Sequence, residues 1–186
     1  MKINRSLIIS LVLMVLVSAL YRIMPNRPWG FAPQWAVAIF SGALFVRKKQ
    51  VAFVLPLLSM FISDALYQIM YLNGLFSMPG FYSGQWLNYL LFTSTTVFGF
   101  LIQGKKVSRI ALAAISAPTS YFLVSNFLVW AGGGGWHHAK TFSGLVNCYI
   151  DAIPFYQYSV LSTVIFSAVL FGTYYLAKNG SQTRTA

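Results

Sequence analysis

Residues 51–72 read VAFVLPLLSMFISDALYQIMYL, and this stretch decides the fold class of the chain. A helix needs about 20 mainly apolar residues to cross the hydrocarbon core of a bilayer. The stretch reaches that length directly after a basic cluster, Arg47, Lys48 and Lys49. It also contains Asp64, and an acidic side chain within a membrane costs roughly 2.5–3.5 kcal/mol on insertion scales, so it must face protein or water. The pattern predicts a membrane-spanning helix that carries an acid for a structural or functional reason.

Five further apolar stretches accompany this one. The six candidate spans are Leu7–Met24, Pro33–Val46, Val51–Leu72, Gly84–Gln103, Ser108–Ala131 and Tyr158–Ala177. Of the 186 residues, 58% are hydrophobic and only 8% are charged, whereas soluble domains carry about 25% charged residues. We therefore expect an all-α membrane protein with the lipid bilayer as its main solvent. It forms a single transmembrane domain over residues 1–186, and the short second span is tilted or partly re-entrant.

Basic residues and tryptophans are sorted to opposite sides of this predicted bundle. Ten of the thirteen Lys and Arg residues precede the first span, follow the last, or lie near the second-to-third and fourth-to-fifth connections. The alternate connections hold only Arg22, Arg27 and Lys140, and all five tryptophans belong to that side. Because positive charge marks the cytoplasmic side, we predict six transmembrane helices with cytoplasmic N- and C-termini in a bacterial inner (cytoplasmic) membrane. This sorting also accounts for the net charge of +11 without nucleic-acid binding.

The first span allows a second interpretation. Lys2 and Arg5, the apolar run Leu7–Val17 and the small residues that follow resemble a cleavable signal peptide. Cleavage would leave five spans with the same orientation. The apolar run continues to Met24, which favours a retained span.

Polar and aromatic side chains gather in the outer halves of three predicted spans. In the third span, Asp64, Tyr67 and Gln68 share one helix face. We expect an outward-open ligand pocket lined by Trp35, Asp64, Tyr67, Gln68, Tyr89, Asn126 and Trp130. The alternative is that these groups only join helices, at about 0.6 kcal/mol for each hydrogen bond on average. In that case Asp64 pairs with Arg22 or Arg27.

The longest predicted connection, Gly132–Gln157, opens on four consecutive glycines followed by Trp136. A glycine hinge beside aromatic side chains is typical of a lid over a ligand. We therefore predict a gating loop formed by Gly132, Gly133, Gly134, Gly135 and Trp136.

The same connection holds His137, His138, Cys148 and Asp151, whose spacing matches no compact zinc pattern. We expect no metal site and no bound cofactor. With only two acids in the chain and no nucleophile, phosphate-loop or zinc-helix motif, we also expect no enzymatic activity.

Several motifs resemble an uncharacterised bacterial integral-membrane family over nearly the whole chain. They are Phe31-Ala32-Pro33, AVAIFSGA at 36–43, Ser63-Asp64, SNFLVW at 125–130, GLVNCYIDAIPF at 144–155 and Leu170-Phe171-Gly172. That family usually carries Gly-Asp where this chain has Ser162-Thr163, so the resemblance assigns no acid to the sixth span.

In layout the family is similar to the substrate-binding (S) components of energy-coupling-factor vitamin transporters. The resemblance implies an S-component-like bundle of six helices that holds a small ligand under its outer loops. It also implies docking on a transmembrane coupling subunit with ATPases.

The leading hypothesis is a binding or uptake component for a small nutrient, such as a vitamin or its precursor. Because the chain has no nucleotide-binding motif, transport would need an energised partner. The second hypothesis is a structural or assembly membrane protein without a ligand. It predicts closed outer helix ends, an Asp64–arginine pair and no cavity above about 300 Å³, the lower end for ligand pockets.

Overall fold

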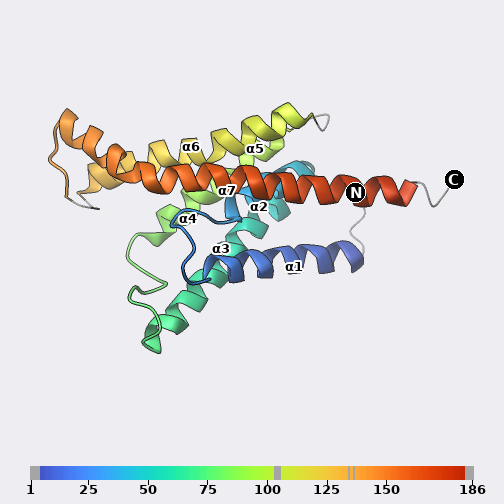
Figure 1. The fold of residues 1–186 in the computed structure, drawn as a ribbon, viewed down its shortest axis with the longest axis horizontal. Helices are drawn as coiled ribbons and strands as arrows, with labels where there is room; N and C mark the ends of the chain where they lie inside the picture. Colours follow the sequence, from blue (N-terminus) through green and yellow to red (C-terminus); the bar gives the residue numbers. More distant parts are fainter. Residues whose placement is uncertain (1–4, 103–105, 134, 136, 183–186) are drawn as a thin grey trace.

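The computed structural model describes residues 5–102, 106–133, 135 and 137–182, and within these residues the regular structure is entirely helical. The helices are α1 (Arg5–Arg22), α2 (Gln34–Leu44), α3 (Lys49–Leu72), α4 (Gln85–Ser94), α5 (Thr96–Phe100), α6 (Val107–Gly132) and α7 (Phe142–Gln182). The predicted all-α fold class is therefore confirmed (Figure 1).

Three helices are long and apolar enough to cross a membrane: α3, α6 and the Phe142–Lys178 part of α7. Helices α1 and α2 are apolar but shorter. Large apolar side chains such as Val17, Leu112 and Val169 point outward and are about half exposed or more. A surface rich in such side chains is compatible with lipid and costly in water. These features are compatible with a helical membrane protein.

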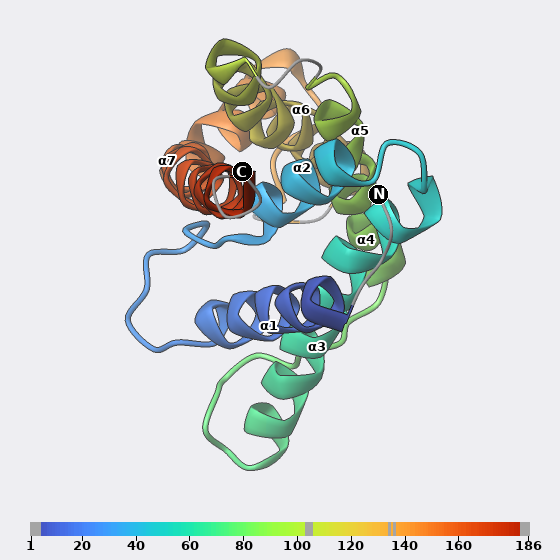
Figure 2. The same ribbon diagram turned by 90° about the vertical axis from the view of Figure 1, so that its right-hand side faces the viewer.

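Helix α2 lies at the centre of the bundle. It contacts α1, α3, α5, α6 and α7, and its residues Ala36, Val37, Ala38 and Ile39 are fully buried. Figure 2 shows it between the α6–α7 pair and the α1–α3 pair. Its neighbours cover this short helix on all sides, so it does not need the length of a lipid-exposed span.

Close packing of α2 depends on two glycines. A Cβ atom placed on Gly99 of α5 would meet the Ala43 nitrogen and the Gly42 Cα atom of α2 at 2.8 Å. A Cβ atom on Gly42 would in turn meet the Thr96 carbonyl. The two backbones therefore touch, as small residues permit in membrane proteins.

The predicted span Gly84–Gln103 is interrupted, because α4 ends at Ser94 and α5 begins at Thr96. The hydroxyl of Thr95, between them, donates to the Phe92 carbonyl at 2.6 Å. Its backbone N–H also reaches the Phe92 carbonyl, at 3.1 Å. A hydroxyl side chain that bonds the nearby backbone competes with regular helix geometry, which explains the break here.

The predicted connection Gly132–Gln157 is mostly helical, because α7 begins well before its end. Asp151 and Pro154 lie inside α7, so the prediction that placed both in a loop is wrong. Aromatic side chains of α6 and α7 stack with their ring centroids 4.5 Å apart, which supports the additional turns. The connection that remains is residues 133–141, and it starts at Gly133, whose φ of +72° ends α6.

Successive helices run in alternating directions, with α4 and α5 taken as one, so helix ends of the same kind lie on the same side of the molecule. Helices α1, α3 and α6 begin, and α7 ends, towards one side of the molecule in Figure 1. Residues 73–84 and 137–141 lie towards the other side. The described helix ends on these two sides are therefore separated along the bundle.

Candidate functional site

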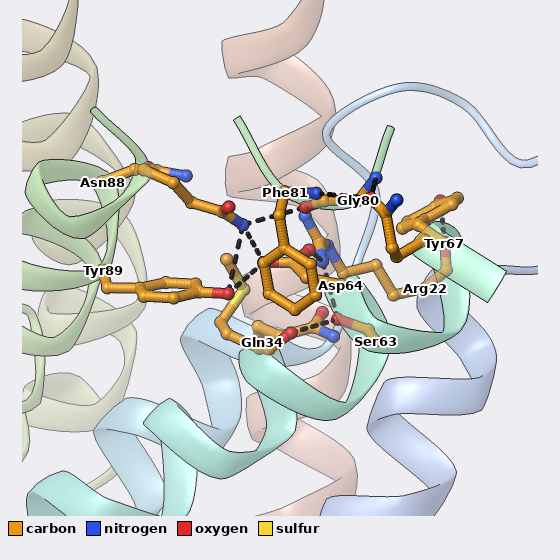
Figure 3. A network of polar contacts seen from close by, with 12 residues as sticks. Arg22, Gln34, Ser63, Asp64, Tyr67, Gly80, Phe81, Asn88 and Tyr89 are labelled. Atoms are coloured by element: carbon orange, nitrogen blue, oxygen red, sulfur yellow. Dashed lines mark hydrogen bonds and ion pairs between the residues drawn. The ribbon is translucent and has the colours of Figure 1, made fainter. Parts of the chain in front are cut away.

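Asp64 is the centre of a polar network between three helices. Its carboxylate, 3% exposed, forms an ion pair with the Arg22 guanidinium of α1 through Oδ1. Its Oδ2 accepts hydrogen bonds from Gln85 Nε2 and the Tyr89 hydroxyl, both at 2.7 Å and both from α4 (Figure 3). A buried carboxylate with a charged partner and two further donors has its desolvation cost offset. The structure thus contains an Asp64–arginine pair, with Arg22 and not Arg27 as the partner.

Two arginines lie beside this acid. Arg22 Nη1 also donates to the Ser63 hydroxyl at 2.6 Å. The Arg22 backbone carbonyl accepts from Arg27 Nε at 2.5 Å and from the Tyr67 hydroxyl at 2.6 Å. Arg27 donates further to the Phe31 carbonyl at 3.2 Å. The end of α1 and the connection after it are therefore fixed to α3 through arginine and tyrosine side chains.

A cavity of about 330 Å³, which we call the main cavity, adjoins the network. Arg22, Arg27 and Asp64 line its polar side. Aromatic rings form another wall, where Trp35 packs edge-on against Phe92 and Tyr121 at centroid distances of 5.7 and 5.5 Å. An apolar, aromatic cavity of this volume with a few convergent polar groups falls at the lower end of the range for ligand pockets.

Residues 73–84, which join α3 to α4, cover the main cavity and are called the cover segment below. Phe76, Met78, Pro79, Gly80 and Tyr82 of this segment line the cavity. Glycines at both ends of the segment have positive φ angles, +69° at Gly74 and +80° at Gly84, which L-residues rarely adopt. The segment thus has a permissive residue at each end.

Two glutamines hold the cover segment in place. Gln68 Oε1 accepts from the backbone N–H groups of Gly80 and Phe81 at 3.0 and 3.2 Å. Gln85 Oε1 accepts from the Tyr82 N–H at 3.2 Å, and its Nε2 donates to the Gly80 carbonyl at 3.0 Å. Because Gln85 also bonds Asp64, the cover segment and the ion pair belong to one network.

Tyr82 connects the cover segment to α4 and α6. Its hydroxyl accepts from Asn88 Nδ2 at 3.1 Å, and Asn88 Oδ1 accepts from the Tyr121 hydroxyl. Burial raises the pKa of the Tyr82 phenol above its usual value of 10.0. The phenol therefore stays neutral at physiological pH.

Two polar atoms at the main cavity lack a hydrogen-bond partner within the described part of the chain. Gln34, 1% exposed, donates through Nε2 to the Ser18 carbonyl at 3.0 Å, but its Oε1 has no partner. The adjacent Trp35 Nε1 is also buried without one. Both residues line the cavity. An unsatisfied buried polar group costs about 1–3 kcal/mol, so each such atom calls for an explanation.

The predicted ligand residues are divided by the structure. Trp35, Asp64 and Tyr67 line the main cavity. Tyr89 and Gln68 do not line the cavity. The Tyr89 hydroxyl donates to Asp64, and Gln68 accepts from the cover segment. Asn126 lines a neighbouring cavity of about 260 Å³, which shares Trp35 and Tyr121 with the first. Trp130 lines neither cavity, and its Nε1 donates to the Ala139 carbonyl at 2.9 Å.

The described residues of the predicted gating loop, Gly132, Gly133 and Gly135, do not line the main cavity. Gly132 and Gly133 form the end of α6, whereas Gly134 and Trp136 are outside the described residues. Gly135 lines a third cavity of about 220 Å³, together with His138, Cys148 and Asp151. His138 Nε2 lies 2.9 Å from Asp151 Oδ2. Among the described residues, no group of three or more His, Cys, Asp or Glu side chains is placed to hold a metal ion.

Sequence reasoning left several site residues out. The cover segment is short and directly follows the polar stripe of α3, so sequence patterns alone do not indicate it as part of the site. Its Met78-Pro79-Gly80 run is a turn signal that could have marked it. Gln34 carried a signal too, since an amide side chain opening an apolar span calls for a partner.

Comparison with curated proteins and with solved structures finds no match. Residues 2–184 match a family of unknown function (DUF6580), and the chain belongs to this family.

Proposed function

We propose that this protein binds a small, partly apolar molecule in the main cavity and serves as a substrate-binding or uptake component of a bacterial inner membrane. In this proposal α1, α2, α3, α4 with α5, α6 and α7 are six spans. The charge sorting supports cytoplasmic termini, and in that orientation the main cavity and the cover segment face outward.

The observation that carries this proposal is the cavity itself. The cavity has a volume of about 330 Å³ and adjoins a buried ion pair. Aromatic side chains and the hydrogen-bonded cover segment also line it. A purely structural bundle gains more from close packing than from such a space, because interiors are normally packed to crystal-like density.

The cover segment is the proposed entrance. It lines the cavity and is held by side-chain bonds from Gln68 and Gln85, which can break without loss of helix structure. Its terminal glycines, Gly74 and Gly84, can absorb a change in backbone angles. Opening at this segment would admit the ligand and expose the Asp64 network to solvent.

Uptake, as opposed to binding alone, would need a source of energy. The layout resemblance to substrate-binding components of energy-coupling-factor transporters favours a transmembrane coupling subunit with ATPases as the partner, and a vitamin or its precursor as the nutrient. No chemical conversion of the ligand is part of this proposal.

A second candidate function is a structural or assembly role without a ligand. The Arg22–Asp64 ion pair favours it, because this is the partner that a structural role for Asp64 predicts. The two candidates differ over the main cavity, which only the first requires to be occupied.

A thermal-shift screen separates them. The purified protein is heated with a panel of vitamins and their precursors, and so is Ala32→Phe, which places a ring into the cavity from a buried lining residue. Ala111→Phe adds the same ring on the exposed face of α6 and is the matched control. Ligand binding predicts a compound that stabilises the wild type and Ala111→Phe but not Ala32→Phe. If every compound acts equally on all three proteins, the structural role is favoured.

A further inference from the structure

The charges at the main cavity do not balance. Two guanidinium groups, Arg22 and Arg27, and one carboxylate, Asp64, line it. The chain has only two acidic side chains, and the second, Asp151, lies in α7 against His138 at 2.9 Å. No other carboxylate side chain exists to neutralise the second arginine. The excess of one positive charge is therefore a property of the sequence as well as of the geometry.

Arg27 is the cation without a carboxylate. It is half-buried, and its four hydrogen bonds go to neutral acceptors: the carbonyls of Arg22 (2.5 Å), Phe31 (3.2 Å) and Pro28 (3.3 Å), and the Tyr67 hydroxyl (3.3 Å). These bonds fix the position of the guanidinium but leave its charge uncompensated. Burying an unpaired charge is costly. A partner that brings a negative charge would relieve that cost.

Arg22 has donors to spare beside it. Only its Nη1 is hydrogen-bonded, to Asp64 and to the Ser63 hydroxyl, while the guanidinium also lies over the Tyr67 ring at 5.5 Å from its centroid. For its Nε and Nη2 atoms there is no hydrogen-bond partner within the described ranges. Guanidinium groups match carboxylates with two parallel N–H donors, which makes arginine the preferred residue for such anions.

The remaining walls suit an apolar body. Met60, Phe92 and Tyr121 also line the cavity, with Trp35 packed against the last two. A ligand here would have one charged end and a flat or compact apolar remainder. Because the volume is at the lower end for ligand pockets, the molecule is small.

We propose that the main cavity selects small organic monoanions, in which a carboxylate is bound by Arg27 and the free donors of Arg22 while an apolar or aromatic body packs against Trp35. This inference rests on the proposed function and adds the chemical class of its ligand. A dicarboxylate would exceed the available positive charge, and a cation would be repelled.

Matched pairs of carboxylates and their neutral amides test the proposal. The full chain in lipid nanodiscs is titrated with acetate and acetamide, benzoate and benzamide, nicotinate and nicotinamide, and indole-3-acetate and indole-3-acetamide, at constant ionic strength. At least one carboxylate is expected to bind the wild type more tightly than its amide. If no carboxylate does so, the proposal is overturned, and this comparison requires no variant to fold.

Variants locate the preference. Arg27→Gln should weaken binding of the preferred carboxylate by about tenfold or more, the loss expected for one charge-assisted hydrogen bond, and should leave the amide unaffected. Arg27→Lys keeps the charge and should retain part of the preference. Lys140→Gln removes a cation that contacts the Trp130 carbonyl, away from the cavity, and is the matched control. Equal carboxylate affinity in Arg27→Gln and the wild type contradicts the proposal.

The same titrations separate this inference from the proposed function. Amide binding that Ala32→Phe abolishes, without any carboxylate preference, would retain a ligand in the main cavity and reject the monoanion. Carboxylate binding that persists in Ala32→Phe would show that the anion binds outside the main cavity. That result would overturn both the proposed function and the monoanion inference.

Discussion

The Arg22 guanidinium in α1 forms an ion pair with the Asp64 carboxylate in α3, and both side chains line one cavity. The pair joins the first helix to the third and leaves Arg27 beside it without an acid. The ion pair holds the two helices together, and its carboxylate neutralises one of the two arginines at the cavity.

Loss of the acid should destabilise the protein. Asp64→Asn leaves the Arg22 charge without its partner, and breaking a buried pair from one side costs about 3–5 kcal/mol. Because Arg22 is partly exposed, we expect the free energy of unfolding to fall by the lower value, about 3 kcal/mol. The measurement is the unfolding midpoint of the protein in nanodiscs. Asp151→Asn removes the only other acid, from a more exposed contact with His138, and should cost less than about 1 kcal/mol. Equal losses for the two variants would contradict the assigned importance of Asp64.

A methyl group at Gly80 should release the cover segment. A Cβ atom there would collide with the Asp64 carbonyl and the Gln68 backbone nitrogen, so the segment must lift. Hydrogen exchange of the Phe81 and Tyr82 amides, which donate to Gln68 and Gln85, should accelerate in Gly80→Ala.

Gly132→Ala is the control, because a Cβ atom at Gly132 meets nothing within 4 Å. It should leave exchange in the cover segment unchanged. Acceleration there in Gly132→Ala, and none in Gly80→Ala, would favour a gate at residues 132–136.

The crossing of α2 and α5 should tolerate no added methyl group. Gly42→Ala would press a Cβ atom against the Thr96 carbonyl and Gly99. Overpacking of this kind costs about 1–3 kcal/mol. Gly172→Ala, where a Cβ atom has open space in α7, should be neutral or slightly stabilising in the same thermal unfolding measurement. A neutral Gly42→Ala would show that the two backbones can separate at little cost.

Cysteine labelling tests the orientation. In a Cys148→Ser background, Leu75→Cys in the cover segment should react with a membrane-impermeant thiol reagent added to intact spheroplasts. Lys48→Cys, at the start of α3, should react only after the membrane is permeabilised. The reversed pattern would put the main cavity on the cytoplasmic side and reject capture from outside.

Much of the helical framework follows from apolar length alone. The stretch Val51–Leu72 corresponds closely to α3, and Ser108–Ala131 to α6, because about 20 apolar residues bounded by polar ones have few alternatives. The start of α7 was not predicted, because Asp151 and Pro154 are typical loop residues. Their helical conformation depends on packing against α6. Tertiary contacts decided that element.

The sequence predicted the candidate site only where one residue was energetically costly within an apolar span and therefore needed a partner. A buried acid needs a partner, and the sequence offered Arg22 or Arg27 on the same side of the bundle; the structure shows Arg22. No comparable demand pointed to Tyr121 or to the cover segment. Their role depends on which helices are neighbours, and that is set by packing across the bundle.

Native mass spectrometry of the protein released from its own membrane shows whether the main cavity holds a small molecule. We expect a wild-type mass raised by one small bound molecule, the same increment in Ala111→Phe, and the bare polypeptide mass in Ala32→Phe. A bare mass for all three proteins, or an increment that survives in Ala32→Phe, would contradict this expectation.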